Sequence, residues 1–243
     1  RDYKVTGVQT CALPISPASQ AGSLPWNNVS QTTAINACQA LGSAYRLINN
    51  DEWMSVAANV ANVATNWSNG TVGDGMLASG HSDNSPAQAC EADADDAKAY
   101  VTASCTGMLS GDFDQRRTLT LSNGELIWDL AGNLSEWTSY FNAADKPTPT
   151  GNSWNDYTAV IGTATTPLSD LIPLNKSFWN TGWDHNQGIG QYQAGENGSG
   201  GALLRGGRFK FPNQVGVFAA DFGLNATDTM NAHKRGFRCV YSP

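Results

Sequence analysis

The sequence carries little charge and has no cluster of basic residues. Only 14% of its 243 residues are charged, and 14 lysines and arginines stand against 21 acidic residues, which gives a net charge of −7. Surfaces that bind nucleic acid need Lys and Arg gathered on one face, whereas here the basic residues are scattered along the chain. We therefore expect no nucleic-acid partner.

Long apolar runs are also missing, because no stretch approaches the roughly 20 residues that a membrane-spanning helix needs. Residues 1–16 look like the in-frame translation of a sequencing-library adapter. We interpret them as non-native and place a single domain at residues 17–243. On this interpretation, any membrane attachment depends on native sequence that is missing from the N-terminus.

The short signatures of several enzyme classes do not occur. There is no G-x-S-x-G elbow, no P-loop and no H-E-x-x-H. Carboxylates for glycosidase chemistry could be chosen from an acidic stretch, but the choice is arbitrary, and an exposed loop is the better account of Asp83, Glu91, Asp93 and Asp95. The three histidines, His81, His185 and His233, lie far apart in loop-like sequence, so we expect no iron site.

Cysteine is sparse and never occurs as CxxC or beside histidine. Apart from Cys11 in the adapter-like stretch, four cysteines remain, and these permit three pairings: Cys38, Cys90, Cys105 and Cys239. This spacing gives little support to a zinc site. Two disulfides formed in an oxidising compartment are the better interpretation, so we expect an extracytoplasmic protein, either secreted or at the cell surface.

Two helices are predicted in the first third of the chain. Residues 30–42 begin with Ser30 as a cap, place apolar residues at helical spacing and end on Gly42. Residues 50–64 form an apolar stripe that starts at Trp53, with acidic residues in the first turn. From 66 to 110 the periodicity disappears, which indicates a long loop.

Strand patterns dominate the remainder. Residues 118–121 and 125–128 flank a Ser-Asn-Gly turn and predict a hairpin. Further strands are predicted at 158–161, 202–205, 215–219 and 236–241. Two early helices followed by a late antiparallel sheet indicate the α+β class.

Four landmarks, at residues 45–53, 128–137, 204–207 and 236–239, resemble in order those of the formylglycine-generating-enzyme (sulfatase-modifying factor) family. The resemblance implies a C-type lectin-like fold with two helices, small twisted antiparallel sheets and long loops. It also implies a disulfide between the first helix and the last strand, which here joins Cys38 to Cys239 and leaves Cys90 with Cys105.

The landmark at residues 128–137 has the chemistry of a calcium loop. Asp129 and Glu136 supply hard carboxylate oxygens, and the irregular backbone around Gly132 can turn carbonyls toward one point. The resemblance implies calcium bound by Asp129, Glu136 and the carbonyls of Gly132 and Leu134. The alternative is that both carboxylates only cap turns by accepting backbone hydrogen bonds.

The family's catalytic residues do not carry over. In the family, two reactive cysteines that bind copper follow the Arg-Gly-Gly motif, but residues 208–216 contain none. We therefore expect neither copper nor iron and predict a non-catalytic ligand-binding module with calcium as a structural cofactor. The alternative is an enzyme of the family with an atypical active site.

Two segments have the composition of a ligand-binding surface for a protein or a glycan. The first combines aromatic, cationic and amide side chains: Arg208, Phe209, Lys210, Phe211, Asn213 and Gln214. Its alternative is a strand whose two phenylalanines point inward. The second has tryptophans beside polar groups suited to sugars, or else buried structural tryptophans: Trp179, Trp183, Asp184 and Asn186.

The C-terminal segment also resembles the variable region of proteins diversified by retroelements, which are receptors on the same fold. That resemblance implies a diversified receptor. Its variable positions would be Arg208, Lys210, Phe211, Asn213, Asn225, Asp228 and Asn231.

Overall fold

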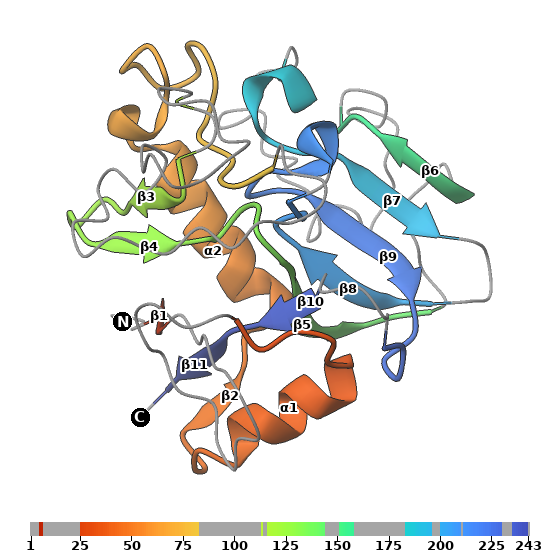
Figure 1. Cartoon of the computed structure of the whole chain (residues 1–243). Helices are drawn as coiled ribbons and strands as arrows, with labels where there is room; N and C mark the ends of the chain where they lie inside the picture. The colour runs from red at the N-terminus through yellow and green to blue at the C-terminus, as the bar shows by residue number, and fades with distance from the viewer. Residues whose placement is uncertain are drawn as a thin grey trace.

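The computed structural model describes residues 5–6, 25–82, 113, 116–143, 151–157, 183–195, 200–209, 211–229 and 235–242. Within these residues two α-helices pack against one large and two small sheets (Figure 1). This arrangement confirms the predicted α+β class. No helix among the described residues is long and apolar enough to cross a membrane.

The first helix, α1 (Gln31–Gln39), begins where the sequence predicts. The Ser30 hydroxyl accepts a hydrogen bond from the Thr33 backbone N–H at 3.1 Å, which satisfies one of the free donors of the first turn. Ala34 and Cys38 are fully buried on the inner face. The helix is shorter than the predicted 30–42 because the chain leaves it before Gly42, whose φ is +129°.

The second helix, α2 (Asn50–Ala61), is fixed by a capping box. The Asn49 side chain accepts from the Glu52 N–H at 2.8 Å, and the Glu52 carboxylate accepts from the Asn49 N–H at 3.1 Å. The predicted apolar stripe is confirmed, since Trp53, Ala57 and Val60 are all fully buried. A short 3-10 turn, η1 (Ala64–Asn66), follows the helix.

The large sheet has the order β10-β5-β8-β9-β7-β6. Its strands are β5 (Ser135–Phe141), β6 (Gly151–Asn155), β7 (Tyr192–Gly195), β8 (Ala202–Arg205), β9 (Ala220–Leu224) and β10 (Arg235–Phe237). The pairs β10–β5 and β7–β9 are parallel and the others antiparallel. The sheet is therefore mixed, because long connections return two of its strands in the same direction. The predicted antiparallel pairing holds for the other two sheets but not throughout this one.

Two small sheets complete the structure. One has the order β1-β11-β2 and pairs β11 (Cys239–Tyr241) with β1 (Val5–Thr6) and β2 (Tyr45–Leu47). The other is the predicted hairpin, in which β3 (Thr118–Thr120) pairs with β4 (Leu126–Trp128) in antiparallel register. The predicted strand at 158–161 lies outside the described residues.

The predicted strand at 215–219 was wrong. A 3-10 turn, η6 (Pro212–Gln214), precedes this stretch, and the strand β9 begins only at Ala220. Val215, Val217 and Phe218 are all fully buried, so the run is apolar without being a strand. The Phe218 N–H donates to the Ile189 carbonyl at 3.2 Å, outside any strand ladder. Burial on all sides produced the pattern that resembles a strand.

The two faces of the large sheet have different coverings. One face packs against α2 through a cluster that includes Trp53, Leu203 and Phe222. The other packs against α1 through Cys38 and Trp137, mainly over β5, β8 and β10, with Leu224 at the end of β9. In Figure 1, β9, β7 and β6 extend to the right beyond α1. The second face is therefore covered by a helix at one end only.

Candidate functional site

The four sequence landmarks meet in the folded chain through buried polar contacts. The Arg205 guanidinium, which is fully buried, donates from Nε and Nη2 to Asn50 Oδ1 at 3.1 and 2.6 Å and from Nη1 to the Phe218 carbonyl at 3.0 Å. Trp53 Nε1 donates to the Val217 carbonyl at 2.7 Å. Arg205 therefore fastens the Arg-Gly-Gly motif on β8 to the start of α2.

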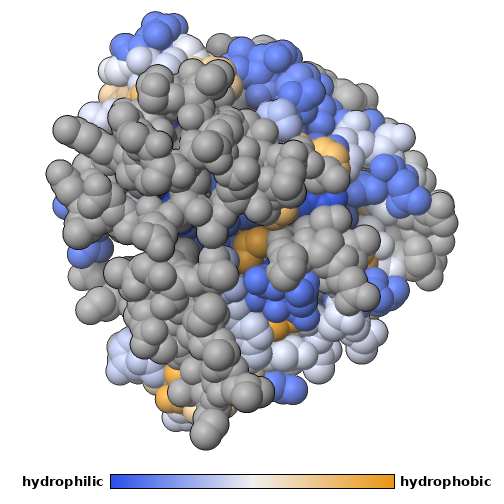
Figure 2. Space-filling view, viewed as in Figure 1, coloured by the Kyte–Doolittle hydropathy of each residue, from blue (hydrophilic) through white to orange (hydrophobic). Residues whose placement is uncertain are grey.

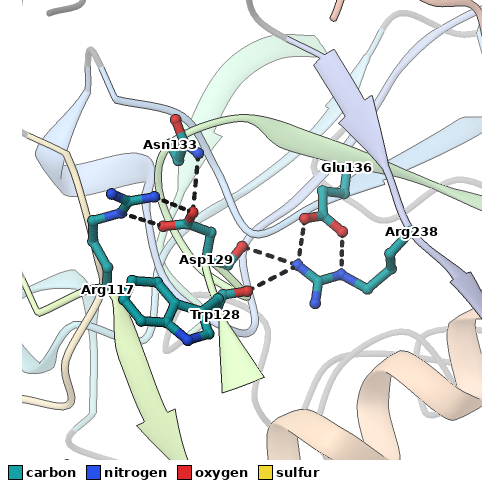
Figure 3. Close-up of polar contacts among 6 residues, drawn as sticks. All are labelled: Arg117, Trp128, Asp129, Asn133, Glu136 and Arg238. Carbon is teal, nitrogen blue, oxygen red and sulfur yellow. Dashed lines mark hydrogen bonds and ion pairs between the residues drawn. The ribbon is translucent and has the colours of Figure 1, made fainter. Parts of the chain in front are cut away.

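The landmarks at 128–137 and 236–239 are joined by Arg238, which interrupts the C-terminal strands between β10 and β11. Its guanidinium forms a two-pronged ion pair with Glu136 and donates from Nη2 to the Trp128 and Asp129 carbonyls at 3.3 and 3.1 Å (Figure 3). Arg238 is 2% exposed and Glu136 is 8% exposed. Burial raises the pKa of Glu136, and the positive charge of Arg238 opposes that shift.

The Asp129 carboxylate forms an ion pair with a second arginine, Arg117. Arg117 Nε and Nη2 donate to the two oxygens of the Asp129 carboxylate at 2.8 and 2.6 Å, and Asn133 Nδ2 donates to one of them at 3.1 Å (Figure 3). Both Asp129 and Asn133 have positive φ, which bends the backbone sharply at both ends of this loop. Asp129 and Glu136 are therefore each held by an arginine.

These contacts bear on the calcium prediction. A calcium site needs carboxylate and carbonyl oxygens directed at one cation. Here each carboxylate faces a guanidinium, and Arg238 also takes two carbonyls of the loop. The residues present do not fit calcium in this arrangement, because the ion would have to displace an arginine. Calcium at Asp129, Gly132, Leu134 and Glu136 stays a prediction.

Thermal unfolding with and without a chelator tests the calcium prediction. Because the two arginines supply the positive charge of the loop, we expect excess EDTA to leave the melting temperature of the purified protein unchanged. The matched control is Asp129→Asn, measured with and without EDTA. A drop in the melting temperature of the wild type on chelation, absent in Asp129→Asn, would establish calcium binding through this loop.

The Arg-Gly-Gly turn joins this loop to the segment that follows. The Gly206 carbonyl accepts from the Gly132 and Gly216 N–H groups at 3.0 and 3.2 Å. Gly207 has a φ of +73°, and a Cβ built on it would lie 2.6 Å from the Gln214 carbonyl oxygen. No other residue fits there. This close approach of the Gly207 and Gln214 backbones places Arg208 beside the part of the large sheet that α1 leaves uncovered.

A cavity of about 200 Å³ lies on this uncovered part of the sheet. Its floor is a row of residues paired across four neighbouring strands: Trp154 on β6 with Gln193 on β7, Gln193 with Asp221 on β9, and Asp221 with Leu204 on β8. Paired residues point to the same face of a sheet, so these side chains form one surface. The other lining residues are Ser135, Asn152, Gly207, Arg208, Gln214, Gly223, Leu224 and Arg235.

Two arginines lie at this cavity. The half-buried Arg208 guanidinium stacks over the Phe211 ring at 4.7 Å, and Arg235, which is 3% exposed, lies over the Trp137 ring at 5.4 Å. Burial lowers the pKa of both arginines, and the nearby charge of Asp221 opposes the shift. Both arginines line the cavity, and the charge of Arg208 further lowers the pKa of Arg235.

The first predicted binding segment is divided by the fold. Arg208 and Gln214 line the cavity, whereas Phe209 is buried and stacks on the His81 ring with centroids 6.0 Å apart. Phe211 supports Arg208, and Asn213 is exposed outside the cavity. Lys210 and Asn231 lie outside the described residues.

Asn225 and Asp228 do not line the cavity, although the Asp228 carbonyl accepts a hydrogen bond from the lining residue Arg235. They form a local turn in which the Asn225 N–H donates to Asp228 Oδ2 at 2.8 Å. Of the seven predicted ligand-binding residues that the structure describes, Arg208 and Gln214 are among the lining residues.

The second predicted segment is structural where it is described. Trp183 is 7% exposed and packs against Trp67 with ring centroids 4.9 Å apart. Asp184 caps the 3-10 turn η5 (His185–Gln187) by accepting from the Asn186 N–H at 2.7 Å. His185 Nδ1 contacts Asp156 Oδ1 at 2.8 Å. Trp179, like Cys90, Cys105 and His233, lies outside the described residues.

Sequence analysis missed Trp154, Gln193, Asp221 and Arg235. Each stands on a short strand in Gly- and Asn-rich sequence, and no local pattern links them. One prediction about cysteine is confirmed, since Cys38 and Cys239 form a disulfide.

Comparison with known proteins agrees with this network of landmarks. The family model of the sulfatase-modifying factor enzyme 1-like domain matches residues 8–243. A search of the curated proteins found no match. The family match spans nearly the whole chain and includes all four landmarks, so the chain belongs to the family of sulfatase-modifying factor enzyme 1-like domains.

Proposed function

We propose that this domain is a non-catalytic ligand-binding module on a C-type lectin-like variant of the α+β fold. The observation that supports this proposal is the cavity beside the Arg-Gly-Gly turn. Its lining residues combine two arginines, one carboxylate, one tryptophan and several amides, which is the small set of convergent polar groups and aromatic surface typical of binding sites. The ligand is a protein or a glycan.

The second candidate function is an enzyme of the family with an atypical active site. The family match favours it, since the description of the family names an enzyme. Against it stands the chemistry of the cavity. Its lining residues include no cysteine or histidine among the part of the chain that the structure describes, and the segment at 208–216 has no cysteine in the sequence.

Oxygen consumption separates the two functions. We expect no oxygen uptake when the protein is incubated with a cysteine-containing peptide and Cu⁺, because the thiolates that would bind a soft metal are missing from the segment after Arg-Gly-Gly. The matched control is the variant in which His81, His185 and His233 are all alanine. Uptake in the wild type that the triple variant loses would contradict a purely binding role.

Two further proposals concern context. The Cys38–Cys239 disulfide supports an extracytoplasmic location, secreted or at the cell surface, because such bonds persist in oxidising compartments. A diversified receptor is supported less well, since Asn213, Asn225 and Asp228 lie outside the cavity. Sequencing codons 205–235 across the source population tests it, and uniform codons would remove it.

A further inference from the structure

The charge of the cavity identifies a class of ligand, provided that the proposed binding function holds. Within the described residues, the guanidinium of Arg208 forms no ion pair or hydrogen bond, and its contact is the Phe211 ring. Arg235 makes one hydrogen bond there, from Nη1 to the Asp228 carbonyl at 3.2 Å, and no ion pair. Of the other buried arginines, Arg117 and Arg238 pair with carboxylates. Arg205 instead donates three hydrogen bonds to Asn50 and the Phe218 carbonyl.

Within the described residues, neither guanidinium at this cavity forms a salt bridge with a carboxylate. The net charge of the whole sequence is −7, yet the charged lining residues in the described part of the chain are two arginines and Asp221. Figure 2 shows mainly hydrophilic residues on the described surface of the side seen in Figure 1. With two arginines and one aspartate, the cavity carries a local positive charge suited to an anionic group. Each guanidinium can donate two parallel hydrogen bonds to the two oxygens of a carboxylate.

The remaining lining residues indicate which kind of molecule carries the anionic group. Trp154 is half-buried on the edge strand β6, where its ring is available to stack. The Gln193 side chain is held in place by donating to the Asn152 carbonyl at 2.8 Å. Aromatic faces pack against the C–H groups of sugar rings, and side-chain amides bond to their hydroxyls. An acidic amino-acid side chain would leave the amides without hydroxyl partners.

We propose that the cavity binds an anionic sugar residue of an acidic glycan, with Arg208 and Arg235 at the anionic group and Trp154 at the sugar ring. The cavity of about 200 Å³ is smaller than the roughly 300–1,000 Å³ of pockets that enclose drug-sized ligands. It therefore fits one residue of a longer polymer. Arg235 is held on Trp137 and β10, so its position is fixed before the ligand arrives.

The test is an array of glycans carrying hexuronate, sialic-acid or sulfate groups, each printed beside its neutral parent, together with polyglutamate. We expect the full chain to bind at least one acidic glycan, to bind its neutral parent about tenfold or more weakly, and to lose binding as NaCl is raised. Arg208→Gln should weaken binding about tenfold or more, whereas Arg208→Lys should retain part of it.

The matched control is Arg46→Gln, which removes one positive charge from a partly exposed ion pair with Glu52 far from the cavity. Trp154→Ala should weaken both acidic and neutral glycans, because it removes the stacking surface. Thermal melts of each variant show whether the fold is retained.

The outcomes separate this inference from the proposed function. Equal binding of acidic and neutral glycans, sensitive to Trp154→Ala, would leave the binding module in place and overturn the anionic ligand. Binding of polyglutamate alone, lost in Arg208→Gln, would show that the ligand is a protein. No binding of any probe would overturn the anionic-sugar inference, and oxygen uptake as well would overturn the binding module.

Discussion

Replacing Arg238 with methionine is expected to lower the free energy of unfolding by about 3–5 kcal/mol, the usual result of removing one partner of a buried ion pair. The substitution leaves the Glu136 carboxylate without its counter-charge and removes the donor to the Trp128 and Asp129 carbonyls. Because burial already raises the pKa of Glu136, part of the loss is offset when that carboxyl takes up a proton.

Urea unfolding of the wild type and three variants measures this effect. The control, Arg46→Met, breaks an ion pair whose arginine side chain is 40% exposed, and we expect it to cost less than about 1 kcal/mol. Adding Glu136→Gln to Arg238→Met removes the unpaired charge and should recover part of the stability. A loss below about 1 kcal/mol in Arg238→Met would contradict the assigned role of the pair.

Removing the disulfide is the second large change. Cys38 and Cys239 are separated by 201 residues along the chain, so their bond restricts the unfolded chain strongly. For a loop of that length the chain-entropy model gives about 5 kcal/mol, and removal of native disulfides typically costs about 2–5 kcal/mol. We expect Cys38→Ala/Cys239→Ala to lower the free energy of unfolding within that range.

Dithiothreitol supplies the control for this prediction. The reductant should destabilise the wild type by a similar amount, because it breaks the same bond. If it also destabilises the double variant, the residual effect reports the predicted bond between Cys90 and Cys105. A wild type whose unfolding midpoint is unchanged by dithiothreitol would show that the Cys38–Cys239 bond contributes nothing to stability.

Local signals predicted the helices and the hairpin well. The Ser30 cap and the acidic first turn of the second helix are local signals, so a few residues suffice to identify the starts of α1 and α2. The Asn49–Glu52 capping box was found only in the structure. The turn at 122–124 likewise fixed β3 and β4, which pair in the expected register.

Long-range contacts could not be predicted in the same way. Arg238 pairs with Glu136 across 102 residues, and no periodicity indicates that a landmark thought to bind calcium would meet an arginine. The strand β5 overlaps the landmark at residues 128–137. Because we interpreted that landmark as a calcium loop, we did not predict the strand. The cavity was missed for a related reason, because its floor draws single residues from β6, β7, β9 and β8.

The arrangement of the cavity floor affects how the domain can evolve. Trp154, Gln193, Asp221 and Leu204 each sit on a different strand, and backbone pairing holds each strand to its neighbours. A substitution at one of the four positions alters one contact point while the other three keep their places. For the proposed binding function, ligand specificity can therefore shift in single steps, one strand at a time, on a backbone that stays the same.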